Sequence, residues 1–186
     1  MSSTTRALFT LLVLSLAAPV TAKELPAYAP DSDADRSAVP DEYKWDLTPI
    51  CFAPDIWETR MTTLDKELGG LSMYRNVLND GNMLVQCLDE YFRLHDEGSK
   101  LAQYANLTHE TDLTNEEFQA MVQRSQGLMD RLSAQSSFIR TEVLALSEKD
   151  MTKAYKKAPE LEQYRLYIDG MRRRQARVLG PEAETV

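Results

Sequence analysis

The stretch LVQCLDEYFRLHDEGSKLAQYA, residues 84–105, decides the fold class. Its apolar side chains recur at the three- and four-residue spacing that places them on one face of an α-helix: Leu84, Cys87, Leu88, Tyr91, Leu94, Leu101 and Ala105. Gly98 interrupts this stripe and costs about 1 kcal/mol relative to alanine, which does not break a helix. The spacing therefore predicts one long amphipathic helix.

The residues before this stretch predict two further helices. The first follows Pro54, ends at Gly69-Gly70 and has an apolar face made of Trp57, Met61, Leu64 and Leu68. A second, short helix is predicted over residues 71–78. Residues 79–81, Asn-Asp-Gly, are typical of a turn and a helix N-cap, and they lead into the long helix.

A fourth helix is predicted to begin at Thr114. Glu117 stands three residues later, and this spacing is that of a capping box, in which each side chain satisfies a backbone N–H of the first helical turn. The apolar stripe of this helix continues to Phe138 and Ile139. A turn over residues 142–144 is expected to end it.

The C-terminal residues predict two more helices. Ser147 caps a fifth over residues 148–157, and Pro159 begins a sixth whose inner face holds Leu161, Tyr164, Ile168 and Met171. Residues 180–184 have the pattern of one more helix start, with little chain after it. Because no segment alternates apolar and polar residues long enough for a strand, the predicted fold is all-α, a bundle or hairpin array of about six helices after an extended leader.

The first 22 residues have the organisation of a secretory signal peptide. Arg6 precedes an apolar run from Ala7 to Val20, and Val20 and Ala22 are the small residues expected before a cleavage site. We predict cleavage after Ala22 and export to the periplasm or the medium; the alternative is an uncleaved N-terminal anchor. No second apolar run follows, so no membrane association is expected after cleavage.

Residues 23–42 form an acidic leader that contains three prolines and few large apolar side chains. This composition is typical of a disordered or extended segment. Large side chains first appear in Tyr43-Lys44-Trp45-Asp46, and nearby prolines prevent a long helix there. We interpret these four residues as an extended docking segment, a candidate contact between domains.

The formal charge of the 186-residue chain is −8. Nucleic-acid binding depends on neutralising phosphates with a basic face, so this charge argues against a nucleic-acid partner and equally against anionic lipid. The concentrated positive charge lies in Arg172, Arg173, Arg174 and Arg177. It either complements the dipole at a helix C-terminus or recognises a carboxylate.

Cys51 and Cys87 both follow the predicted signal peptide, in a part of the chain where export would permit a disulfide. The alternative is two small buried side chains used for packing. A structural zinc site takes about four ligands, and the chain has only two cysteines and two histidines. No metal site and no cofactor are therefore predicted within these residues.

The sequence contains no recognisable catalytic motif. His109-Glu110 begins like the zinc-peptidase motif H-E-x-x-H, but Leu113 stands where the second histidine would be needed. The glycines do not have the spacing of a nucleotide-binding loop. No serine or cysteine lies in a recognisable motif that pairs a nucleophile with a general base. We predict no catalytic residue in this chain.

Taken in order, short segments along the chain resemble the N-terminal region of oligoendopeptidase F, a zinc metallopeptidase family related to the thimet oligopeptidases. The segments that carry the resemblance are residues 39–48 (VPDEYKWDLT), Trp57, Tyr104-Ala105, residues 112–115 (DLTN), residues 137–139 (SFI), Glu142 with Leu144, residues 159–161 (PEL), Tyr164-Arg165, and Leu179 with Glu182 and Glu184.

This resemblance implies an enzyme of two mainly helical halves around a channel that admits short peptides. Zinc would be held by H-E-x-x-H in the later half of the full-length parent, and its bound water would attack the peptide bond. Residues 43–186 would then be the N-terminal helical domain with its last helix truncated, inactive alone. The alternative is a free-standing exported helical module that binds a peptide or a protein.

Overall fold

The computed structural model describes residues 24–25, 27–31 and 38–175. The predicted signal peptide and the helix start at residues 180–184 lie outside these ranges. The chain divides into two units, Met1–Tyr43 and Lys44–Val186. In the described part of the first unit, a 3₁₀ helix (η2) spans Asp41–Tyr43, and the rings of Tyr28 and Tyr43 lie 5.0 Å apart.

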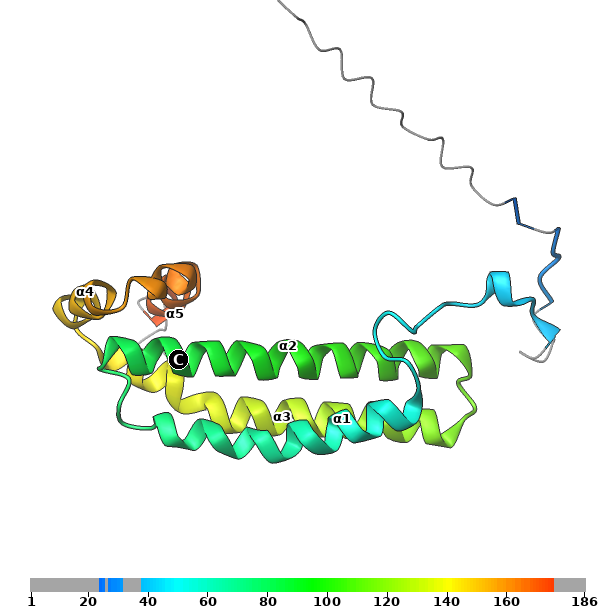
Figure 1. The fold of residues 1–186 in the computed structure, drawn as a ribbon, viewed down its shortest axis with the longest axis horizontal. Coiled ribbons are helices and arrows are strands. Elements are labelled where there is room, and N and C mark those ends of the chain that lie inside the picture. Colours follow the sequence, from blue (N-terminus) through cyan, green and yellow to red (C-terminus); the bar gives the residue numbers. More distant parts are fainter. Residues whose placement is uncertain (1–23, 26, 32–37, 176–186) are drawn as a thin grey trace, which may run out of the picture. The chain divides into compact units, whose positions relative to one another are not determined.

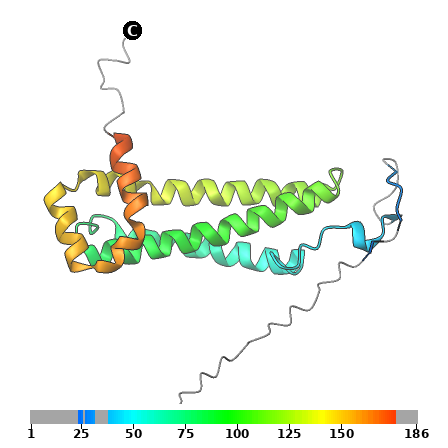
Figure 2. The same ribbon diagram turned by 90° about the horizontal axis from the view of Figure 1, so that it is seen from above.

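The second unit is built on three helices that lie side by side (Figures 1 and 2): α1 (Pro54–Glu67), α2 (Gly81–Thr111) and α3 (Glu116–Ala145). Helices α2 and α3 form an antiparallel hairpin, and α1 packs against α2. The apolar stripe that predicted α2 is its buried face. Leu84, Cys87, Leu88, Leu94, Leu101 and Ala105 are all fully buried.

Three shorter helices follow the hairpin: α4 (Glu148–Lys157), a 3₁₀ helix η4 (Pro159–Tyr164) and α5 (Arg165–Gln175). Helix α4 packs on α2 and α5 packs on α3, at the end of the bundle where α2 begins (Figure 1). Gly81 is the contact point with α4, because a Cβ on it would lie 2.6 Å from the carbonyl oxygen of Ala154. None of the helices in the described ranges is long and apolar enough to cross a membrane.

The described residues form an all-α fold with five α-helices, one fewer than predicted. The short helix expected over residues 71–78 is instead a 3₁₀ helix, η3 (Leu68–Tyr74). Two glycines weaken an α-helix here, and Ser72 closes a tight turn by donating a hydrogen bond to the Gly69 carbonyl oxygen (2.8 Å). Asn76, two residues after η3, has a φ of 64°, which lies in the left-handed region.

The predicted caps of α2 and α4 are confirmed, whereas the predicted capping box of α3 is wrong. Asp80 Oδ1 accepts the Asn82 N–H, and Ser147 Oγ accepts the Asp150 N–H. Helix α3 is capped one residue later than expected, by Asn115, which accepts from the N–H groups of Glu117 and Phe118 at 3.0 and 3.2 Å. The Thr114 hydroxyl is already engaged, because it donates to Asp112 Oδ1 (2.7 Å).

The turn predicted at residues 142–144 is also wrong, because α3 continues to Ala145. Val143 is fully buried and extends the apolar face of the helix by one turn. Glu142 accepts the Asn76 N–H (2.7 Å) and so holds the loop that precedes α2. Packing and this contact extend the helix beyond the point where its sequence pattern weakens.

Candidate functional site

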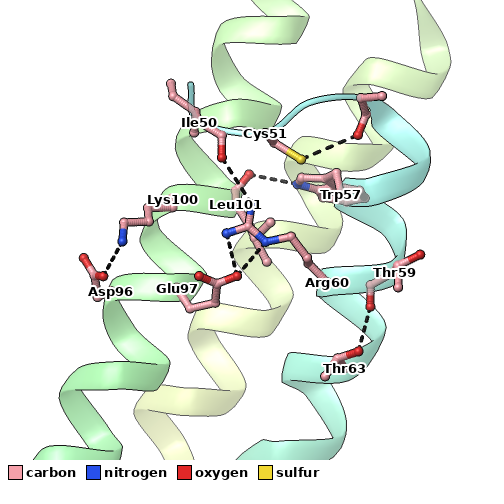
Figure 3. Close-up of polar contacts among 11 residues, drawn as sticks. Ile50, Cys51, Trp57, Thr59, Arg60, Thr63, Asp96, Glu97, Lys100 and Leu101 are labelled. Carbon is pink, nitrogen blue, oxygen red and sulfur yellow. Dashed lines mark hydrogen bonds and ion pairs between the residues drawn. The ribbon is translucent and has the colours of Figure 1, made fainter. Parts of the chain in front are cut away.

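Helix α1 is joined to α2 by a buried indole and a half-buried guanidinium, and the guanidinium also holds the segment before α1 (Figure 3). The Trp57 indole N–H donates to the Leu101 carbonyl oxygen on α2 (2.9 Å), and Trp57 is 1% exposed. Arg60 donates to the Ile50 carbonyl oxygen (3.1 Å) and to Glu97 Oε1 on α2 (2.7 Å). These contacts join the segment before α1, α1 and α2, and we call them the clasp.

The predicted docking residues lie next to the clasp in sequence but are divided between the two units. Tyr43 belongs to the first unit, and Lys44, Trp45 and Asp46 belong to the second. Trp45 is 59% exposed. Asp46 accepts from the Thr48 hydroxyl (2.6 Å) and N–H, and these hydrogen bonds lower the pKa of its carboxyl. A docking role for these residues stays a prediction.

The four arginines near the C-terminus do not form one group among the described residues. Arg172 donates to the carbonyl oxygens of Val143 (3.1 Å) and Leu146 (2.8 Å) and pairs with Glu148. It therefore complements the C-terminus of α3, a helix other than its own. Arg173 and Arg174 are exposed, and Arg177 lies outside the described ranges.

No disulfide joins Cys51 and Cys87: both thiols are free and buried. The clasp holds Ile50 beside Glu97, which is ten residues beyond Cys87 on α2, or about 15 Å at the helical rise. A disulfide requires Cα atoms about 4.4–6.8 Å apart. Burial raises the pKa of Cys87 to about 12, with a smaller contribution from Glu142. The packing alternative therefore describes this pair in the structure.

Within the described ranges, no three His, Cys, Asp or Glu side chains are grouped so that they could hold a metal ion.

An aromatic cluster lies between α2 and the last helices. The ring of His95 lies 5.9 Å from the Tyr91 ring in this cluster, which also contains Phe92, Tyr164 and Tyr167. The stacked rings of Phe92 and Tyr164 (5.3 Å) join α2 to η4. This cluster attaches the last helices to the hairpin.

Two ion pairs bridge α1 and α3. Arg124 binds Glu58 in a bidentate manner (2.5 and 2.7 Å), and Arg131 binds Asp65 (2.8 Å). Both partners advance by seven residues from one pair to the next, so α1 and α3 run in the same direction. Arg124 lowers the pKa of the Glu58 carboxyl. A cleft of about 490 Å³ lies between the two helices at these pairs.

Sequence reasoning did not identify Arg60 or these bridging pairs. Arg60 is 37 residues from Glu97, and each bridging pair is separated by 66 residues. Such pairs depend on the register between helices, which local spacing does not contain. The burial of Trp57 could be predicted from its position on the apolar face of α1.

Similarity to known proteins is spread over most of the chain. The family model described as Oligopeptidase F matches residues 142–186. Group B oligopeptidase PepB of Streptococcus agalactiae is 24% identical over 150 residues, which is 80% of this chain and 25% of that protein. The oligoendopeptidase F homolog of Borreliella burgdorferi is 20% identical over 151 residues, with 81% and 25% covered.

Two solved structures share the fold. A putative peptidase from Chlamydophila abortus superimposes with a TM-score of 0.69 at 24% identity, over 80% of this chain and 25% of that one. Oligoendopeptidase-F from Enterococcus faecium gives 0.61 at 25% identity, with 72% and 26% covered. The chain spans about a quarter of the length of these relatives. The resemblance to the N-terminal region of oligoendopeptidase F is thereby confirmed.

Proposed function

We propose that the bundle is the non-catalytic N-terminal domain of an exported zinc oligopeptidase, and that it walls the channel through which short peptides reach the catalytic half. The observation that supports this most strongly is the extent of the similarity: it covers 80% of this chain but a quarter of the relatives' length. In this proposal the zinc and the residues that activate its water belong to the other three quarters.

The long-range contacts of the bundle are consistent with a rigid wall of a substrate channel. The clasp and the α1–α3 ion pairs tie three helices together through contacts far apart in sequence. A bundle with many such contacts keeps its surface rigid while peptides pass. A flexible lid, by contrast, is held by few long-range contacts.

Domain replacement tests this function. The matched quarter of Group B oligopeptidase PepB is exchanged for the present chain from Lys44 onward, and cleavage of a quenched oligopeptide is measured on the soluble, zinc-loaded chimera. We expect retained turnover, with deletion of the same region as the inactive reference. An unrelated three-helix bundle of equal length is the control. A chimera as inactive as the deletion would contradict the proposal.

Export is a separate part of the proposal, supported by the apolar run Ala7–Val20 and the small residues Val20 and Ala22. N-terminal sequencing of the protein recovered from the periplasmic or extracellular fraction is expected to begin at Lys23. Recovery in the cytoplasm with Met1 retained would refute export and leave the domain assignment standing.

A further inference from the structure

The cleft between α1 and α3 differs in charge from the rest of the molecule. The side chains that surround it include three cations and one carboxylate: Lys66, Arg124, Arg131 and Asp65. With Glu58, which is bound to Arg124, counted as well, the local formal charge is about +1 in a chain of −8. The most favourable ligand for such a cleft is a small anion.

The two arginines are held in place by the protein. Arg124 is fixed by its two bonds to Glu58, and its guanidinium carbon lies 5.3 Å from the centre of the Trp57 ring. Arg131 is bound by Asp65 through Nε (3.0 Å) and Nη2 (2.8 Å). A guanidinium carries five N–H donors, so each arginine keeps several for a ligand. Their side chains are already ordered, which reduces the entropy lost on binding.

Lys66 supplies a cation of a different kind. Within the ranges that the structure describes it makes no ion pair and no hydrogen bond, and it is exposed. Its charge is therefore available to a ligand without breaking a contact of the bundle.

The shape of the cleft comes from Gly127 and Met61. Arg124, Gly127 and Arg131 follow one face of α3, and the glycine leaves room between the two guanidiniums. A Cβ on Gly127 would meet a single atom of the described chain within 4 Å, Arg131 Nη1 at 3.5 Å. Met61, 4% exposed, forms an apolar floor on the α1 side.

We propose that this cleft binds a carboxylate attached to a short apolar body, namely the C-terminal carboxylate of a short peptide. The planar arginine fork matches a carboxylate in geometry, and a net charge of about +1 is balanced by one negative charge. Gln123 offers a further amide donor, and Met61 contacts the terminal side chain. The choice of a peptide as the source rests on the proposed function; the preference for a carboxylate rests on the cleft alone.

Calorimetric titration of the purified chain tests the proposal with three probes: N-acetyl-trialanine, its C-terminal amide, and inorganic phosphate. We expect the acid to bind at least tenfold more tightly than the amide and than phosphate. Equal binding of acid and amide, or no measurable binding of the acid, would overturn the proposal. Tighter binding of phosphate would overturn the peptide as ligand, because it would show a site for inorganic anions.

Two variants locate the site. Lys66→Gln removes the unpaired charge and is expected to weaken acid binding about fivefold, while Lys156→Gln, an exposed lysine on α4, leaves it unchanged. Gly127→Leu fills the cleft without a change of charge and is expected to abolish binding with no loss of thermal stability. Wild-type affinity in both cleft variants would refute the location. Turnover of the domain-replacement chimera is a separate readout, so the two proposals can fail independently.

Discussion

The sharpest prediction about the fold concerns the same substitution, glycine to alanine, at Gly127 and at Gly81. Neither glycine has a positive φ, so both substitutions are compatible with the backbone. The added Cβ at Gly127 makes an ordinary contact with Arg131 Nη1 at 3.5 Å. At Gly81 it would lie 2.6 Å from the Ala154 carbonyl oxygen and 3.1 Å from its Cα, so the backbone of α4 has to move.

Helix propensity sets the size of the first effect. Alanine is favoured over glycine by about 1 kcal/mol in a helix interior, so Gly127→Ala is expected to raise the free energy of unfolding by about that amount. Gly81→Ala forces α4 away from the N-terminus of α2, and overpacking of this kind costs about 1–3 kcal/mol. Since 1 kcal/mol corresponds to about 2–4 °C for a chain of this size, the two Tm values should lie on opposite sides of wild type.

Thermal unfolding followed by circular dichroism at 222 nm, confirmed by urea titration, measures both variants against the wild-type chain. Gly69→Ala is the matched control, because a Cβ there meets no atom of the described chain within 4 Å. A Gly81→Ala variant as stable as wild type would show that α4 does not pack closely on Gly81. A lower Tm for Gly127→Ala would contradict the open space beside Arg131.

Three further predictions concern the backbone at Asn76, the two free thiols and the pH dependence of stability. Because the φ of Asn76 is 64°, Asn76→Gly is expected to raise the Tm slightly, and Asn76→Ala is expected to lower the free energy of unfolding by about 1 kcal/mol. Equal Tm values for the two variants would refute a left-handed Asn76. Without reductant, a thiol reagent should modify neither Cys51 nor Cys87 in the native chain and both in urea; no reaction in urea would reveal a disulfide. Burial raises the pKa values of Cys87 and Tyr167 to about 12 in the folded chain. The unfolded chain therefore loses these protons at lower pH than the folded chain, and Tm should fall as pH rises above about 9. A flat Tm between about pH 9 and 11 would contradict this.

The parts of the fold that depend on local spacing could be predicted from the sequence. The stripe from Leu84 to Ala105 identified α2 and its buried face, and Asp80 and Ser147 were recognised as caps. The cap of α3 was predicted one residue too early, at Thr114 instead of Asn115, because both residue types accept from backbone N–H groups. Asp112 decides it by binding the Thr114 hydroxyl.

The parts that depend on register between helices could not be predicted. Arg172 was considered as a complement to a helix dipole, but its target is the C-terminus of α3, which packing brings beside α5. The cleft is lined by residues of both α1 and α3, and Glu58 and Asp65 reach Arg124 and Arg131 from a helix that runs in the same direction. The pairing of residues on α1 with residues on α3 cannot be predicted from the residue spacing within either helix.

The most direct test of the central claim, that this chain is a non-catalytic domain, is a paired measurement on the purified protein after incubation with zinc and dialysis. Bound zinc is measured by atomic emission and cleavage by fluorescence of a quenched oligopeptide. We predict zinc well below one equivalent and no turnover above the buffer rate. One equivalent of zinc together with turnover that a chelator abolishes would contradict the claim.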